Sequence, residues 1–397
     1  MQRTSFLTRM IWLGLCITGL AACISRTPSA LTSEPAQTAT PITPSPAPSV
    51  INQSVILYRG DSQRTGVYNV PAIRYQPEVK WQTKMGSALL TSPLIVGDIL
   101  YTGSPNGTLY ALNNETGEEI WSVSGFGHLE NSGAVSGDVI LAGGYSQFVR
   151  LLDRHTGDEL WSFETENTIQ AAPLIVDKLA YIATYHAVYA LDLDSGSLIW
   201  EVLTGTEDAY MGAPAYDNGV IYTTGGKLLL ALEADTGKEI WRVESDEMFL
   251  GLAVANQAIY VGNWDHYLYA FDQLTGEERW KFQASSELWL PPAVNEDTVY
   301  SGNLDTFYAI NVQTGELRWS FKTSGNLVSE PIIAEDVIYM TDGNHETSRS
   351  PHHLYALDAK TGEELWVFEI TSTFLPAPAV GDGVIYLTST GEVIALE

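Results

Sequence analysis

Few residues of this chain could do chemistry, and their spacing matches no established catalytic motif. The 397 residues include seven His and two Cys, with no Cys after Cys23. Disulfides, thiolate metal sites and CxxCH haem attachment are therefore excluded from the rest of the chain. Three His near Asp342 could bind a metal, but they match no ligand motif: His345, His352 and His353. The sequence has no phosphate-binding Gly-rich loop, HExxH helix or GxSxG elbow, so we expect neither catalysis nor a resident metal.

The first residues carry the features of an export signal. Arg3 and Arg9 flank an apolar run over residues 10–20, which spans only about 16 Å as a helix at ~1.5 Å per residue and is too short to cross a bilayer. The Leu-Ala-Ala sequence before Cys23 resembles the bacterial lipobox, in which the Cys is lipidated and becomes the mature N-terminus. We therefore expect residues 1–22 to be a lipoprotein signal peptide and Cys23 to be the lipid attachment site.

Residues 23–54 are expected to form a tether between this anchor and a folded body at 55–397. From Ser25 to Ser49, twenty of twenty-five residues are Ser, Thr, Pro or Ala, and six are Pro. Such a composition buries too little surface to offset the entropy of ordering. A Pro-rich linker extends about 3.1 Å per residue, so this one could reach roughly 75 Å. The predicted location is outside the cytoplasm, attached to a membrane by its N-terminal lipid (the cell surface, or the periplasm in a cell with two membranes).

The charge of the chain limits its partners. Acidic residues number 48 against 20 basic ones, for a formal net charge of -28. Nucleic-acid binding depends on Lys and Arg that neutralise phosphates, so a nucleic-acid partner is excluded. We expect instead a protein partner in the cell envelope and a monomeric body.

A repeat of about forty residues fills the body. The sequence Thr-Gly-x-x-x-Trp occurs six times, with a seventh copy that begins with Ser195, and a segment of the Tyr-Ala-Leu-Asp type precedes each copy. An eighth Trp at the same spacing lies before the first copy. We expect these eight side chains to dock neighbouring repeats onto one another: Trp81, Trp121, Trp161, Trp200, Trp241, Trp280, Trp319 and Trp366.

Each repeat is expected to form four short strands. In the first, alternating apolar residues at 92–96, 99–102, 108–112 and 119–123 are separated by turn residues such as Gly97-Asp98 and Thr116-Gly117. Four-stranded units of this length are typical of β-propeller blades. The last repeat, from Ala379, lacks a Trp strand, and the strand at Val79–Thr83 lacks a repeat before it. Pairing the two predicts an all-β, eight-bladed propeller whose Trp81 strand completes the C-terminal blade.

The repeat resembles that of the PQQ-like (quinoprotein-type) β-propeller family, roughly YALDxxTGxxxW, over residues 81–397. The Tyr58-Arg59-Gly60-Asp61 and Thr65-Gly66 segments resemble the lead-in often seen before the first blade of that family. The whole architecture is similar to that of BamB-like lipoproteins, although the long tether departs from them. Quinoprotein dehydrogenases of the family hold PQQ on the axis beneath an adjacent Cys-Cys disulfide and beside Ca²⁺ ligands. This chain lacks the disulfide, so we expect no PQQ and no other cofactor.

A propeller of this kind has two faces. The turns between strands 1–2 and 3–4 form one, here called the turn face, which gathers acidic residues. The loops between strands 2–3 and between blades form the other, here called the loop face. Exposed aromatics mark interaction surfaces, and seven residues that map to the loop face are a candidate binding surface: Trp264, His266, Trp289, Tyr210, Phe249, His186 and Phe374. The alternative is that aromatic side chains of this face turn inward and plug the axial channel.

These features predict an exported, lipid-anchored, non-catalytic propeller that acts as a protein–protein interaction scaffold. One alternative is a BamB-like component of outer-membrane β-barrel protein assembly. Others are a ligand-sensing surface lipoprotein and a relative of the PQQ-dependent oxidoreductases.

Overall fold

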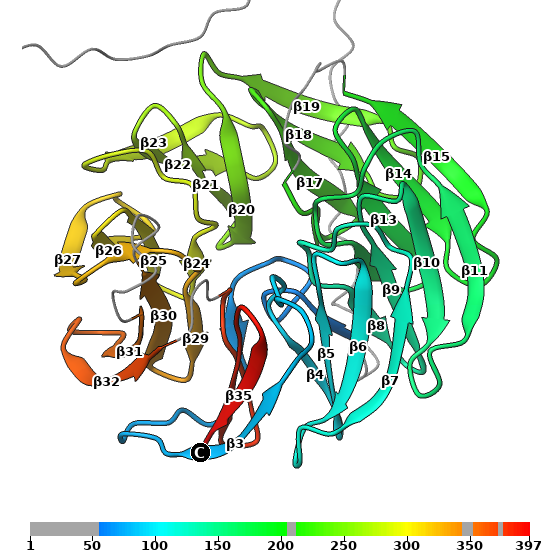
Figure 1. Ribbon diagram of the computed structural model, residues 1–397. Coiled ribbons are helices and arrows are strands. Elements are labelled where there is room, and N and C mark those ends of the chain that lie inside the picture. The colour runs from blue at the N-terminus through cyan, green and yellow to red at the C-terminus, as the bar shows by residue number, and fades with distance from the viewer. Residues whose placement is uncertain (1–54, 205–211, 344–351, 372–375) are drawn as a thin grey trace, which may run out of the picture. The chain divides into compact units, whose positions relative to one another are not determined.

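The chain is all-β, with eight four-stranded sheets arranged as blades around a central axis (Figure 1). The computed structural model describes residues 55–204, 212–343, 352–371 and 376–397. Within these ranges no segment is helical, and none therefore meets the length and hydropathy of a membrane-spanning helix. The predicted eight-bladed propeller is confirmed.

The strands of each blade run antiparallel from the axis outward. The innermost strands are β4 (Leu94–Val96), β8 (Ala134–Ser136), β12 (Leu174–Val176), β16 (Ala215–Asp217), β20 (Phe249–Ala255), β24 (Ala293–Val294), β29 (Ile332–Ala334) and β33 (Ala379–Gly381). The second strands are β5 (Ile99–Gly103), β9 (Val139–Gly143), β13 (Leu179–Ala183), β17 (Val220–Gly225), β21 (Ala258–Asn263), β25 (Thr298–Asn303), β30 (Val337–Gly343) and β34 (Val384–Thr388).

The outer half of each blade carries the repeat signature. The third strands are β6 (Thr108–Asn113), β10 (Phe148–Asp153), β14 (Ala187–Asp192), β18 (Leu228–Glu233), β22 (Tyr267–Asp272), β26 (Thr306–Asn311), β31 (His352–Asp358) and β35 (Glu392–Leu396). The outermost strands are β7 (Glu119–Ser124), β11 (Glu159–Glu164), β15 (Leu198–Leu203), β19 (Glu239–Glu244), β23 (Glu278–Gln283), β27 (Leu317–Lys322), β32 (Glu364–Ile370) and β3 (Val79–Lys84). A short strand, β28 (Asn326–Leu327), pairs with β30.

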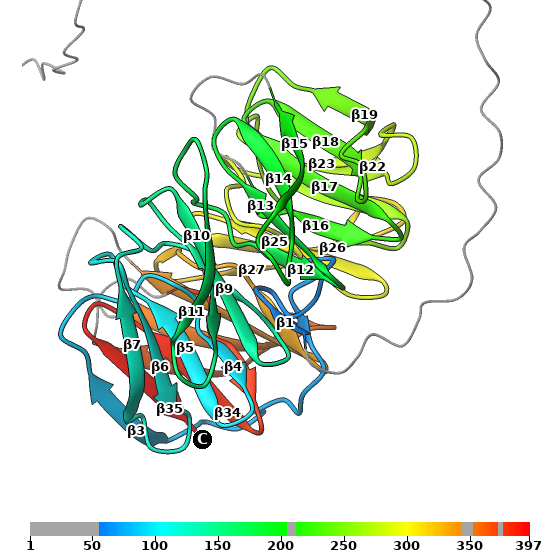
Figure 2. The same cartoon turned by 90° about the vertical axis from the view of Figure 1, so that its right-hand side faces the viewer.

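The ring closes between the first and last parts of the propeller. Strand β3 pairs antiparallel with β35, and Trp81 lies opposite Ala395. The two strands lie side by side in both views (Figure 1, Figure 2). The predicted completion of the eighth blade by the Trp81 strand is therefore confirmed.

The repeat Trp residues lie at the seams between blades. In each blade the register shifts by one residue beside the Trp, a β-bulge that re-aims the ring. Each indole N–H then donates to a backbone carbonyl beyond the seam, as from Trp121 to Arg154 (3.0 Å) and from Trp200 to Ala234 (2.8 Å). The bonds of the other six follow this pattern, and that of Trp366 ends on Ile73, which lies before the first blade in the chain.

The Gly of each Thr-Gly pair fits against the Trp of the preceding blade. Gly237 has φ of 71°, and a Cβ atom built on it would lie 2.7 Å from the ring of Trp200. A side chain at this position would therefore be disfavoured for two reasons: the positive φ, and the contact with the Trp ring. Seven seams repeat this contact, which explains why Thr-Gly and Trp recur together in the sequence.

The core lies in these seams, so each blade is covered by its neighbours. Ala215 and Tyr222 of the fourth blade, for example, pack with Phe249 and Leu252 of the fifth. Seven blades also place a buried Tyr from the second strand beside the seam Trp: Tyr101, Tyr181, Tyr222, Tyr260, Tyr300, Tyr339 and Tyr386. Six of these hydroxyls donate to the same carbonyl that accepts the indole N–H.

Residues 55–75 are called the lead-in below: residues 55–68 run through the axis of the ring, and residues 72–74 reach the turn between β29 and β30 and the seam of Trp366. Strand β1 (Val55–Leu57) pairs antiparallel with β8, and β2 (Val67–Tyr68) pairs parallel with β29. The blue ribbon near the centre of the ring in Figure 1 is this segment. Between the two strands the lead-in accepts backbone hydrogen bonds from four successive inner strands, at the carbonyls of Ser62, Gln63, Thr65 and Gly66 (2.7–2.9 Å). It therefore satisfies inner-edge donors that a bare propeller would leave unpaired.

Candidate functional site

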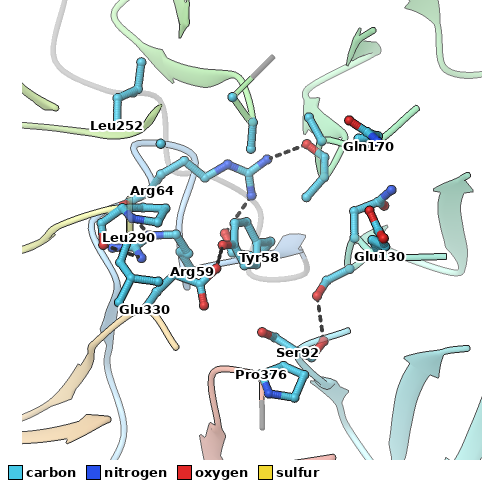
Figure 3. Close-up of a pocket in the computed structure, with 18 of the residues that line it drawn as sticks. Tyr58, Arg59, Arg64, Ser92, Glu130, Gln170, Leu252, Leu290, Glu330 and Pro376 are labelled. Carbon is cyan, nitrogen blue, oxygen red and sulfur yellow. Dashed lines mark hydrogen bonds between the residues drawn. The ribbon is translucent and has the colours of Figure 1, made fainter. Parts of the chain in front are cut away.

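The axis opens to the loop face as a pocket of about 230 Å³ (Figure 3). Its walls come from the segments just before the innermost strands of seven blades and from the first half of β20 in the fifth, and its floor comes from the lead-in. Glu130 of the second blade and Trp289 of the sixth line the pocket from opposite sides of the ring. Glu330, from the seventh blade, lines it next to the sixth. The pocket is where the loops of every blade converge.

Two buried arginines form the floor. Arg64 is 1% exposed and donates to the carbonyls of Tyr58 (2.6 Å), Pro214 (3.0 Å) and Pro173 (2.9 Å). Arg59 is 2% exposed and donates to carbonyls of its own segment and of the sixth blade. Burial lowers the pKa of the Arg64 guanidinium to about 10. Both cations therefore hold the lead-in to the blades through backbone oxygens.

Carboxylates accompany these cations. Burial raises the pKa of Asp61, while its bonds to Thr65 and the nearby charges of Arg64 and Arg59 act in the opposite direction. Glu330 accepts a hydrogen bond from the Tyr58 hydroxyl. The positive charge of the two arginines is thus countered by nearby carboxylates, those of Asp61 in the lead-in and Glu330 in the pocket wall.

A polar cluster forms the wall at the second blade. The Tyr145 hydroxyl donates to Oε2 of Glu130 (2.8 Å) and accepts a bond from Gln170. The His128 ring lies 5.1 Å from that of Tyr145, and its Nε2 is 3.2 Å from Oε1 of Glu130. Burial, and next the bond to Glu130, raises the pKa of Tyr145 to about 12. Glu130 thus lines the pocket as a hydrogen-bond acceptor held by Tyr145.

An apolar surface lies beside the pocket on the fifth and sixth blades. Trp264 is 44% exposed, Trp289 is 45% exposed and Leu304 is 41% exposed. The backbone N–H of Leu288 donates to the carbonyl of Asn263 (3.4 Å), so the loops that carry the two Trp residues lie side by side. We call these three residues the tryptophan surface. Because Trp289 also lines the pocket, the surface and the pocket are continuous.

The predicted binding residues differ in how exposed they are. Trp264, Trp289 and His266 are exposed on the loop face, and His186 is half-buried there. Tyr210 and Phe374 lie outside the described residues. Phe249 is 1% exposed, so its prediction as a surface residue is wrong.

The reason for that error is the length of β20. This innermost strand begins at Phe249 itself, and the ring packs edge-on against Tyr269 and Phe271 in the core between two blades. The lead-in fills the axial floor. The alternative in which aromatic side chains plug the channel stays a prediction, because Tyr210 and Phe374 lie outside the described residues.

The lead-in was the functional feature that sequence reasoning missed. Tyr58, Arg59 and Arg64 form the floor of the pocket, yet the sequence suggested only a segment before the first blade. A usable signal was present. Two Arg occur within six residues outside the repeat, in a chain with only 20 basic residues, and each blade exposes an inner edge that needs partners.

His353, beside Asp342, belongs to a structural network. Asp342 is fully buried, and its two oxygens accept bonds from the Tyr355 hydroxyl (2.9 Å), Gly325 N–H (2.7 Å), Ser324 hydroxyl (3.1 Å) and both Nδ1 (2.8 Å) and N–H (3.0 Å) of His353. Five donors saturate this carboxylate. Ser324 and Asp342 both contact the same His353 nitrogen, so the three do not form a proton relay of the Ser-His-Asp type.

No metal centre is formed by the described residues, among which no three ligating side chains cluster. His345, the third histidine of the sequence hypothesis, lies outside them.

Comparisons with known proteins agree with this architecture. The family described as outer membrane protein assembly factor BamB matches residues 69–209, 184–290 and 268–397. The outer membrane protein assembly factor BamB of Yersinia pestis is 25% identical over 229 residues, which cover 52% of this chain and 56% of that protein. A tetrathionate hydrolase of Acidithiobacillus ferrooxidans is 24% identical over 159 residues, 40% of this chain and 28% of the hydrolase.

The fold also occurs in enzymes. A quinohemoprotein alcohol dehydrogenase from Pseudomonas putida HK5 superposes with a TM-score of 0.73 at 14% identity, over 86% of this chain and 80% of that one. At this identity the likeness shows the propeller fold alone. The alignments with the two sequence relatives span about half and about a quarter of their own lengths.

Proposed function

Since this chain belongs to the family described as outer membrane protein assembly factor BamB, we propose that it is an exported, non-catalytic propeller that binds protein partners during outer-membrane β-barrel assembly. The observation that carries the proposal is the loop face. There an exposed apolar surface with two Trp residues adjoins a pocket at which all eight blades meet. Exposed aromatics next to a recess are typical of protein-binding surfaces.

The chemistry of the pocket supports a role without catalysis. Its volume of about 230 Å³ lies below the ~300–1,000 Å³ of typical small-molecule sites. The N–H groups of Arg59 and Arg64 already bond backbone carbonyls, and the lead-in to which they belong occupies the axis. A tricyclic quinone such as PQQ, whose carboxylates need free cationic donors, does not fit these residues.

Thermal unfolding tests the proposal that the protein does not bind PQQ. PQQ with Ca²⁺ should leave the Tm of the full chain unchanged, because binding to the native state alone raises stability by mass action. A saturable rise in Tm would revive the oxidoreductase alternative.

We also propose that Cys23 carries the lipid anchor, with residues 24–54 as the tether. The support is the sequence of residues 1–23 and the envelope location in the names of the relatives. The change Cys23→Ala should move the exported protein from the membrane to the soluble fraction, since acyl chains supply the membrane affinity. Retention of the variant in the membrane would contradict the anchor.

Affinity capture from the organism's own envelope tests the partner. The full chain, tagged at its C-terminus and cross-linked in living cells, should recover β-barrel assembly proteins identifiable by mass spectrometry. Recovery of other envelope proteins in their place, reproducibly and in the absence of any barrel assembly factor, would overturn this role while leaving a scaffold for another complex.

A further inference from the structure

The loop face is strongly acidic. The described loops between strands 2–3 and between blades carry a single Lys or Arg, Lys227, whose ammonium bonds the carbonyl of Asp246. The same loops carry eight carboxylates: Glu130, Glu166, Asp246, Glu247, Asp265, Glu287, Asp305 and Glu330. A surface with this imbalance attracts cations and repels anionic lipids and nucleic acids.

The acidic groups surround the tryptophan surface. Asp265 follows Trp264 in the chain, Glu287 lies two residues before Trp289, and Asp305 follows Leu304. Nε2 of His266 is 3.7 Å from Oε1 of Glu287, and Lys322 pairs with Asp305 (3.0 Å). Exposed indole rings beside carboxylates are the combination that holds Lys and Arg side chains, because the ring face and the carboxylate both attract the cation.

The pocket continues this arrangement toward the axis. Trp289 enters its lining from the sixth blade and Glu130 from the second, with Glu330 in the seventh. The buried cations below it, Arg59 and Arg64, bond backbone carbonyls and face Asp61 from within the lead-in. The volume of about 230 Å³ admits one long side chain, and the tryptophan surface lies outside it, so a ligand that contacts both must be an extended chain.

We infer that the loop face binds an extended, cationic segment of a partner polypeptide, with one Lys or Arg side chain in the axial pocket between Trp289 and Glu130. The inference rests on the proposed function and specifies the chemistry of its partner. The carboxylate excess of the surrounding loops, rather than the pocket floor with its two Arg side chains, selects a basic segment, and the aromatic surface anchors it.

Fluorescence anisotropy with the full chain tests this binding. The probe is a short fluorescein-labelled peptide of alternating Lys and Ser residues, and the control probe has Glu in place of each Lys. We expect saturable binding of the Lys peptide that weakens with salt, because exposed charges are screened beyond about 10 Å at 0.1 M ionic strength. We expect no binding of the Glu peptide.

Variants on the two faces locate the site. Trp289→Ala should raise the Kd for the Lys peptide about tenfold, as for a central interface aromatic, and Trp264→Ala and Glu130→Gln should raise it by about threefold each. Trp289→Phe, which keeps an aromatic ring, should recover part of the affinity. The matched controls lie on the turn face: Leu274→Ala, at a side chain that is 76% exposed, and Glu118→Gln, at an exposed carboxylate, should leave Kd unchanged.

Two results would overturn the inference. If the Glu peptide bound as tightly as the Lys peptide, the site would not select for positive charge. If the turn-face variants lost as much affinity as the loop-face variants, binding would reflect only the net charge of the protein. Partner capture separates this inference from the proposed function. Capture of barrel assembly factors without Lys-peptide binding overturns the cationic ligand alone, whereas peptide binding without such capture overturns the assembly role alone.

Discussion

The Trp residues of this protein fall into two regions with opposite environments. At the seams, Trp121, Trp200 and Trp280 are 8–9% exposed, and each donates its indole N–H to the neighbouring blade. On the loop face, Trp264 and Trp289 are nearly half exposed and border a pocket. The same side chain therefore joins blades in one region and is available for a partner in the other. Its position relative to the strand register, rather than its type, decides which.

The largest expected effect concerns a seam. Trp200→Ala removes a buried ring and an indole donor to Ala234. We expect the free energy of unfolding to fall by about 3–5 kcal/mol, the usual cost of an aromatic-to-Ala change in a core. Denaturant titration followed by circular dichroism measures it.

Trp200→Phe is the matched control for that change. The Tyr181 hydroxyl also donates to the Ala234 carbonyl (3.4 Å), so the acceptor keeps one partner and the loss should be about 1–2 kcal/mol. If Trp200→Ala cost no more than Trp200→Phe, seam packing would not be the source of stability.

The next prediction compares two Gly→Ala changes in the blade that follows Trp200, to separate the cost of backbone conformation from the cost of disturbing the contact with the Trp ring. Gly237→Ala places a Cβ 2.7 Å from the Trp200 ring at φ of 71°, whereas Gly219→Ala, at φ of 83° in the same blade, meets nothing within 4 Å. We expect a loss of about 2–3 kcal/mol for Gly237→Ala and about 1 kcal/mol for Gly219→Ala, the cost of a left-handed residue alone. Equal losses in thermal unfolding would show that the Trp contact contributes nothing.

The seam tyrosines predict a loss of stability at alkaline pH. Burial raises the pKa of Tyr222 to about 12 from an ordinary value of 10. The folded state therefore retains a proton that the unfolded state releases, and stability falls as the pH rises from about 10 to about 12. Tyr222→Phe should remove about 2–3 kcal/mol of this pH dependence, since one pKa unit corresponds to about 1.4 kcal/mol. The measurement is the unfolding midpoint across that window, and an unchanged slope in the variant would contradict the burial effect.

The smallest effect on stability is expected on the loop face. Trp264→Ala and Trp289→Ala should each change the free energy of unfolding by no more than about 0.5 kcal/mol, as exposed positions do, while binding of the Lys peptide weakens. A loss comparable to that of Trp200→Ala would mean that these rings are structural and would erase the difference between the two regions.

Much of the fold could be predicted because the repeat is local in sequence. Thr-Gly turns, alternating apolar residues and the fixed Trp spacing each reflect contacts within a blade or with the next blade. The completion of the last blade by the Trp81 strand followed from counting strands, since one repeat lacked a Trp strand and one Trp strand lacked a repeat. The second-strand Tyr residues, such as Tyr222, also recur at the repeat spacing and were overlooked.

The candidate site was predictable only in part. Trp264 and Trp289 were identified because the repeat does not require them. Phe249, from the same kind of loop, is buried in a strand that begins four residues earlier than the other innermost strands. The orientation of a side chain at a strand end depends on register, and a shift of one residue reverses its face.

The sequence by itself determined the number of blades and the positions of the seams, because these depend on interactions between residues close in the repeat. It determined the closure as well, because one repeat lacked a Trp strand and one Trp strand lacked a repeat. Only the tertiary structure decided what fills the axis. Arg64 bonds carbonyls more than one hundred residues away, and Ile73 provides the acceptor that completes the seam of Trp366. Such pairings join segments with no shared pattern, and they form only once the ring has brought eight inner edges together.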